Sequence, residues 1–134
     1  LQPAGRIAPG AAARAHVLLV EDDPGVRNAT RMLLRVEGHE VSTAASLGEA
    51  LQQVTEHPAI RVIVSDFHLG GSETGLQVVA AVRETLGPGV KAILMTGDTS
   101  TAMQGLARDA GMRTASKPVK ADELLGLIDE LLAG

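Results

Sequence analysis

The stretch that decides the fold is Ile60–Asp66, which reads Ile-Arg-Val-Ile-Val-Ser-Asp. Its β-branched apolar run, which stops on a carboxylate, is typical of a strand buried on both faces of a parallel sheet. In open α/β sheets, the residue at the carboxyl end of such a strand projects into the crevice where ligands bind. We therefore expect the fold to present Asp66 at that edge. The simpler alternative is an aspartate that ends a strand and starts a turn.

Composition limits what kind of protein surrounds this strand. The 134 residues are enough for one domain with its own core, and that core must be aliphatic because Phe67 is the single aromatic residue. The chain has no cysteine, which excludes disulfides and cysteine-ligated zinc. The net charge of −4 argues against non-specific nucleic-acid binding. No apolar run approaches the roughly 18 residues of a membrane span, so no direct membrane contact is expected.

Strands and helices alternate outward from the central strand. Strands are predicted at 16–20, 39–44, 60–66, 90–95 and 111–116, and helices at 24–37, 46–57, 76–87, 99–110 and 121–132. This alternation predicts an α/β fold, a doubly wound five-stranded parallel sheet with five helices. The strand at 39–44 is the more polar one and is expected at an edge. Residues 1–15 are rich in Ala, Gly and Pro and are interpreted as a linker or disordered tail before a domain at 16–134.

Short-range signals mark where several helices begin and end. Asp23 is expected to cap the first helix, with Pro24 in its first turn and Gly38 in a left-handed conformation after its end. Ser46 and Glu49 form a capping-box pattern that opens the second helix.

Polar side chains follow four of the five predicted strands. Glu21 and Asp22 come after the first strand, Asp66 ends the third, Thr96 follows the fourth and Lys117 the fifth. In a parallel sheet all of them meet at one edge. Three acids there would repel one another unless a cation shares the site, and a set of oxygen ligands favours Mg²⁺. A hydroxyl and an ammonium beside a carboxylate suit phosphoryl transfer, with Asp66 as the nucleophile that forms an acyl phosphate.

With these residues in this order, the chain resembles the response-regulator receiver domain of two-component signalling over about residues 16–133. The resemblance is carried by the spacing of Asp22, Asp66, Thr96 and Lys117, by the Leu-Val-Glu-Asp-Asp-Pro start and by the Lys-Pro pair after the fifth strand. It implies a flavodoxin-like (βα)5 fold. It also implies a cytoplasmic phosphorelay protein that catalyses only its own phosphorylation and dephosphorylation, and is therefore not an enzyme acting on outside substrates.

The same resemblance implies a role for each site residue. Glu21, Asp22 and Asp66 would bind Mg²⁺ with the backbone carbonyl of His68. Asp66 would accept a phosphoryl group from a phosphohistidine of a histidine kinase or a histidine phosphotransfer domain. Thr96 would then bond a phosphoryl oxygen, Lys117 would pair with the phosphoryl charge, and the Lys117–Pro118 peptide would be cis. His68 and Asp98 would border the path of attacking water and influence the lifetime of the phosphoryl group.

Departures from the family pattern concern how a signal leaves the site. Thr114 stands where many members have an aromatic residue that turns inward, so a switch of the surface built by the fourth helix, fifth strand and fifth helix must rely on other shifts. The loop 68–75 is rich in glycine and one residue longer than usual, which predicts a more flexible loop. The stretches around Asp66 and Thr96 look most like receivers at the C-terminus of hybrid sensor histidine kinases. A homodimer through the switching surface is a further expectation.

Two other function classes remain open from the sequence. A haloacid-dehalogenase-like hydrolase also uses Asp, Thr and Lys, but it places the nucleophile in an Asp-x-Asp motif after the first strand, and Asp66-Phe67-His68 lacks the second Asp. A docking module that does not depend on phosphorylation would not need all five polar residues. Intact-mass detection of a phosphoryl adduct separates these classes.

Overall fold

The structure, a computed structural model, describes residues 14–98 and 100–133. A single sheet holds five parallel strands in the order β3-β2-β4-β5-β6. The strands are β2 (His16–Val20), β3 (Glu40–Ala44), β4 (Ile60–Asp66), β5 (Lys91–Thr96) and β6 (Arg113–Ser116). The helices are α2 (Pro24–Val36), α3 (Leu47–Glu56), α4 (Gly75–Leu86), α5 (Thr101–Asp109) and α6 (Ala121–Ala133). The predicted doubly wound, flavodoxin-like fold is confirmed.

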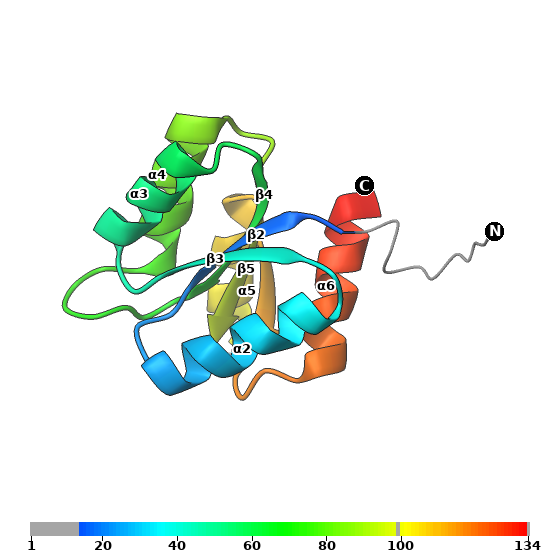
Figure 1. The fold of residues 1–134 in the computed structure, drawn as a ribbon. Coiled ribbons are helices and arrows are strands. Elements are labelled where there is room, and N and C mark those ends of the chain that lie inside the picture. The colour runs from blue at the N-terminus through cyan, green and yellow to red at the C-terminus, as the bar shows by residue number, and fades with distance from the viewer. Residues whose placement is uncertain (1–13, 99, 134) are drawn as a thin grey trace.

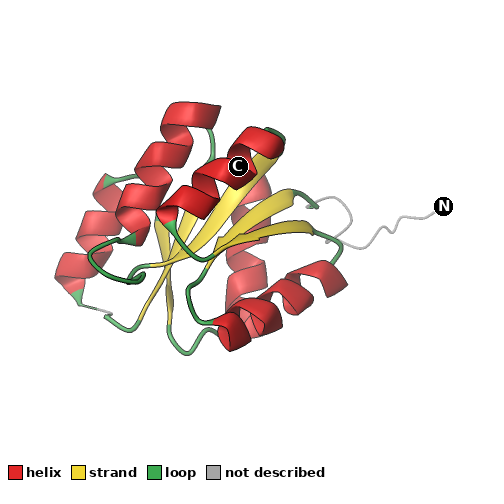
Figure 2. Ribbon diagram, turned by 60° about the vertical axis from the view of Figure 1, so that its left-hand side comes forward, coloured by secondary structure: helices red, strands yellow, loops and turns green. Residues whose placement is uncertain are grey.

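Helices cover both faces of the sheet, as Figures 1 and 2 show. Alternate residues of the central strands point to opposite faces, so Ile63 and Leu94 pack with α3, α4 and α5, whereas Val62 and Val64 pack with α2 and α6. The side chains on both faces are buried, which explains why β4 reads as a continuous apolar run. The core is aliphatic, and Phe67 packs only at its margin.

The expected end signals operate as predicted. Asp23 accepts hydrogen bonds from the backbone N–H groups of Gly25 and Val26 and caps α2, which has Pro24 at its start. Gly38 has φ of 96° just after α2. Ser46 caps α3 by accepting from Glu49 N, although the Glu49 carboxylate accepts from Ala45 N and not from the cap itself.

Several boundaries shift by one or two residues. The polar strand lies at the sheet edge as expected but begins at Glu40, because His39 is held by other contacts: its N–H donates to Leu34 O and its Nδ1 accepts from Ala15 N. The helix expected from residue 99 begins at Thr101, because Ser100 acts as its cap. Residue 99 and residues 1–13 of the expected tail lie outside the described residues.

Two further features bear on the sequence predictions. The Lys117–Pro118 peptide is cis, as expected. None of the helices within residues 14–98 and 100–133 has the length and hydrophobicity that crossing a bilayer requires.

Candidate functional site

The site lies where the strand order reverses. Strand β2 has β3 on one side and β4 on the other, so the connections leave β2 and β4 in opposite directions and open a crevice at their carboxyl ends. Glu21 follows β2 and Asp66 ends β4. With Asp22 they form a cluster in which one carboxylate oxygen of each residue lies within 4.8 Å of the others. The predicted convergence of the three acids is therefore observed, and this cluster could bind a metal ion.

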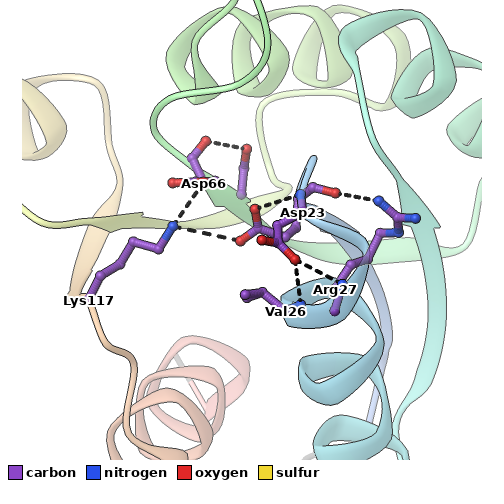
Figure 3. Close-up of polar contacts among 8 residues, drawn as sticks. Asp23, Val26, Arg27, Asp66 and Lys117 are labelled. Atoms are coloured by element: carbon purple, nitrogen blue, oxygen red, sulfur yellow. Dashed lines mark hydrogen bonds and ion pairs between the residues drawn. The ribbon is translucent and has the colours of Figure 1, made fainter.

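Asp66 is held from across the sheet by Lys117. Asp66 is 6% exposed, and Lys117 Nζ lies 2.9 Å from Asp66 Oδ2 (Figure 3). Partial burial lowers the pKa of Lys117, but the hydrogen bond to Asp66 and the charges of the three acids raise it more, so the net shift is upward. The lysine therefore stays protonated beside the carboxylate.

Glu21 is the least satisfied acid of the cluster. Its Oε2 accepts a hydrogen bond from Asp23 N at 3.2 Å, whereas Oε1 is enclosed and has no hydrogen-bond partner; Lys117 Nζ is 3.8 Å away, within ion-pair range but beyond hydrogen-bond range. Burial, with Asp66 nearby, raises the pKa of Glu21 to about 7. An unpartnered buried carboxylate oxygen is costly, and a divalent cation would satisfy it. The residues present therefore fit a hard metal ion.

The adjacent acids Asp22 and Asp23 have different surroundings. Asp22 is exposed and belongs to the carboxylate cluster, while Asp23 is engaged as the α2 cap. Arg27, one turn into α2, donates from Nη1 to the backbone carbonyl of Glu21 at 2.8 Å and so fixes the start of the acidic loop (Figure 3). No pattern in the sequence signals this contact, because an arginine at that helix position usually extends into solvent.

Thr96 is placed at the end of β5, next to β4. It is 3% exposed, and its Oγ1 accepts a hydrogen bond from Asp98 N at 3.0 Å, which leaves the hydroxyl hydrogen available for donation. The backbone carbonyl of Thr96 accepts from Lys117 N, so the two residues are tied together. Asp98 is exposed, and hydrogen bonds from Ser100 lower its pKa, with a smaller contribution from the charge of His68.

The backbone around Asp66 is fixed by its own loop. His68 and Thr74 form an isolated antiparallel bridge whose hydrogen bonds, Leu69 N to Glu73 O and Gly75 N to Phe67 O, flank the pair. This register leaves the His68 carbonyl without a hydrogen bond in the part of the chain that the structure describes. It is therefore available as a further oxygen ligand, as expected.

Glycine is required where α4 begins. A Cβ atom on Gly75 would lie 2.6 Å from the backbone oxygen of Asp66 and 3.0 Å from Ser65 Oγ, which itself donates to that oxygen. The start of α4 can approach the end of β4 only because residue 75 has no side chain. The glycine-rich loop suggested flexibility, but the sequence did not indicate which glycine permits a close approach.

Comparison with known proteins agrees with this geometry. The family model of the response regulator receiver domain matches residues 17–129. The chain belongs to this family. The transcriptional regulatory protein GlrR of Escherichia coli is 33% identical over 119 residues, which is 88% of this chain and 26% of that protein. The transcriptional regulatory protein KdpE of Mycobacterium tuberculosis is 34% identical over 110 residues, 81% of this chain and 47% of that protein. The receiver thus spans about a quarter to a half of these relatives.

Solved receiver structures have the same fold. The chemotaxis protein CheY4 of Vibrio cholerae has a TM-score of 0.79 at 28% identity, covering 88% of this chain and 98% of that one. A CheY-like receiver domain protein of Methanospirillum hungatei has a TM-score of 0.77 at 31% identity, covering 89% and 94%. The chain is a receiver domain of two-component signalling.

Proposed function

We propose that this receiver accepts a phosphoryl group on Asp66 from the phosphohistidine of a histidine kinase or a histidine phosphotransfer domain. The observation that carries the proposal is the pairing of Asp66 with Lys117 beside a carboxylate cluster that contains a buried, unpartnered oxygen of Glu21. A partly buried ion pair next to two further acids is an expensive arrangement for stability alone. A divalent cation would offset the charge of these acids, and together with Lys117 it would offset the charge of a transferred phosphoryl group.

In the proposed transfer, a carboxylate oxygen of Asp66 attacks phosphorus in line with the phosphohistidine nitrogen. A P–O bond forms, the P–N bond breaks, and the imidazole nitrogen leaves with the electron pair of that bond. Lys117 Nζ lies 2.9 Å from Asp66 Oδ2, and its positive charge stabilises the carboxylate form that acts as the nucleophile. The resulting acyl phosphate forms at the sheet edge, where α2 and the loop after β4 border the crevice.

The carboxylates of Glu21, Asp22 and Asp66, with the carbonyl of His68, would hold Mg²⁺. The ligands are all oxygen atoms, which this ion prefers over the nitrogen and sulfur ligands of softer metals. The bound ion would neutralise charge on the transferred phosphoryl group. Glu21 would contribute the enclosed oxygen and Asp22 the exposed one, so the site would remain open to solvent on the side from which a donor approaches.

Thr96 and Lys117 would bind the phosphoryl group of the modified Asp66. The free hydroxyl hydrogen of Thr96 would donate to one phosphoryl oxygen, and the Lys117 ammonium would shift from the carboxylate to another. Because Lys117 N donates a hydrogen bond to Thr96 O, both movements would shift the segment where β5, β6 and α6 meet. We propose that the surface built by α5, β6 and α6 carries the output and that it supports a homodimer.

The wider setting is also part of the proposal. The receiver would catalyse its own phosphorylation and dephosphorylation without turning over an outside substrate, in the cytoplasm and with no nucleic-acid contact of its own. The sequences around Asp66 and Thr96 support fusion to a hybrid sensor histidine kinase, whereas the relatives named above are transcriptional regulatory proteins.

Intact-mass spectrometry tests the proposal. After treatment with acetyl phosphate and Mg²⁺, the wild type should gain the mass of one phosphoryl group, whereas Asp66→Asn and an EDTA-treated sample should gain none. Asp23→Asn is the matched control, because it changes a neighbouring acid that only caps a helix, and it should still gain the adduct. Steady hydrolysis of an outside phosphate ester would instead favour a haloacid-dehalogenase-type activity, and the lack of any adduct would favour a docking module.

A further inference from the structure

A second candidate site lies at the opposite end of the sheet from the acidic cluster. A cleft of about 640 Å³ opens where β2 and β3 begin, a volume within the range of small-molecule sites. It is lined by Arg14, Ala15, His16, Arg35, Gly38, His39, Glu40, Val41 and Ala59. None of these residues belongs to the phosphoacceptor site, so the cleft has no part in the function proposed above.

Two arginines without an ion-pair partner in the described residues supply positive charge to this cleft. Neither guanidinium, of Arg14 or of Arg35, forms an ion pair or a side-chain hydrogen bond within residues 14–98 and 100–133. The Arg14 side chain lies against Gly38, where a Cβ atom would collide with Arg14 Nε. Gly38 therefore lets a guanidinium enter the wall of the cleft at the end of α2.

The buried imidazole of His39 adds a donor. His39 is 5% exposed, and its Nδ1 accepts a hydrogen bond from Ala15 N at 3.1 Å. A neutral imidazole that accepts at Nδ1 carries its hydrogen on Nε2. Nε2 has no hydrogen-bond partner among the described residues. It is not fully enclosed either, because Glu21 Oε1 is the one enclosed side-chain polar atom without a partner in that part of the chain. Nε2 is therefore accessible at the cleft that His39 lines. A donor that is accessible at the cleft can form a hydrogen bond to an acceptor on a bound ligand.

The net positive charge of the cleft favours an anionic ligand. Glu40 is the one acid on its wall and cannot balance two arginines. Guanidinium groups pair in fork geometry with carboxylates and phosphates, and because the two arginines outweigh Glu40, the net positive charge of the cleft attracts a dianion more strongly than a monoanion. We propose that the cleft formed around Arg14, Arg35 and His39 binds a dianionic phosphate group, either free or as a small phosphate ester.

Backbone amide NMR on the whole chain in EDTA tests this site. Titration with inorganic phosphate and with glycerol 3-phosphate should give saturable shifts at Ala15, Gly38 and Glu40 and leave the Asp66 edge unchanged. Tighter binding of the ester would identify a phosphate ester as the ligand, and equal binding would identify free phosphate. Acetate, a monoanion, should bind at least about tenfold more weakly than phosphate.

Variants on one helix provide the matched comparison. Arg35→Gln should weaken phosphate binding by about tenfold, the size expected for losing one charge-assisted contact. Arg31→Gln, on the same helix but outside the cleft lining, should bind as the wild type does. The site is rejected if the shifts do not saturate, if they appear only near Asp66, if acetate binds as well as phosphate, or if Arg35→Gln leaves the affinity unchanged.

Discussion

At the scale of single residues, burial of Glu21 disfavours the charged carboxylate that its proposed role as a metal ligand requires. Its side chain is enclosed beside Asp66, one of its oxygens has no hydrogen bond, and its pKa is raised from 4.5 to about 7, chiefly by desolvation. The sequence predicted that Glu21 would reach this edge. It did not predict that Glu21 would be buried while Asp22 stays exposed, because that difference depends on how Arg27 fixes the loop.

The raised pKa predicts a pH-dependent stability of the metal-free protein. Below about pH 4.5 Glu21 is protonated in both the folded and the unfolded chain. Between about pH 4.5 and 7 the unfolded chain releases this proton and the folded one keeps it, so the free energy of unfolding falls as pH rises. A shift of this size corresponds to at most about 3 kcal/mol.

Urea denaturation in EDTA at several pH values checks this contribution. Relative to the wild type, Glu21→Gln should gain stability across that pH window and keep it above pH 7, because an amide cannot ionise. Added Mg²⁺ at pH 8 should stabilise the wild type more than the variant. Parallel stability curves for the two proteins, with no divergence between pH 4.5 and 7, would show that the folded protein does not hold the Glu21 proton in this range.

At the scale of elements, the start of α4 lies in close contact with the end of β4. Gly75→Ala would place Cβ 2.6 Å from Asp66 O and 2.7 Å from Leu94 Cδ2. We expect it to destabilise the fold by about 2 kcal/mol through overpacking and to slow adduct formation, because the Asp66 backbone must move. Gly126→Ala is the control: a Cβ atom on residue 126, inside α6, would have no atom within 4 Å, and this variant should gain about 0.5–1 kcal/mol. Equal effects of the two substitutions in urea would refute the close-approach argument.

Arg83 connects α4 to the residue before β5 and to the segment between α5 and β6 by donating to backbone carbonyls. From α4 it donates Nε to Val90 O, Nη1 to Ala110 O and Nη2 to Gly111 O, at 2.8–3.0 Å. Arg83→Met keeps much of the apolar stem but leaves these carbonyls without their donor, so we expect a loss of about 2 kcal/mol in the free energy of unfolding. Arg61→Met, at an exposed position of β4, should change stability by less than about 0.5 kcal/mol. Urea midpoints that fall together for both variants would show that the carbonyl contacts contribute little.

At the scale of the whole molecule, hydrophobic periodicity and helix caps in the sequence predicted the strands, the helices and their order. The run Ile60–Asp66, the Asp23 cap and the order of polar strand ends were enough for the sheet and for the edge where the site lies. Contacts between distant segments were not predictable, since they follow from packing: Arg83 on three carbonyls, Glu73 accepting from Leu47 N at the start of α3, and the close approach at Gly75. The last of these positions Asp66, so local patterns predicted which polar residues meet at this edge but not what positions them.

We expect transmission from Asp66 to the surface built by α5, β6 and α6 to depend on Lys117, because β6 offers no aromatic switch. Thr114 is half-buried in β6, whose end is tied to β5 by the hydrogen bond from Lys117 N to Thr96 O, and Arg113 pairs with Glu130 to link β6 to α6. A shift of the Lys117 ammonium from Asp66 to a phosphoryl oxygen would therefore move β6 and α6 together. In the wild type, phosphorylation should change amide NMR shifts across α5, β6 and α6.

Lys117→Ala should separate phosphorylation from this response. Loss of the ammonium removes one charge-assisted contact with Asp66, so the adduct should form about tenfold more slowly. It should still be visible by intact mass, while the amide shifts of β6 and α6 stay at their unphosphorylated values. Lys120→Ala, an exposed lysine of the same connection, should form the adduct and show the full response. A normal response of β6 and α6 in phosphorylated Lys117→Ala would mean that the signal leaves by a route that does not need the Lys117 ammonium, such as Thr96 or the loop after β4.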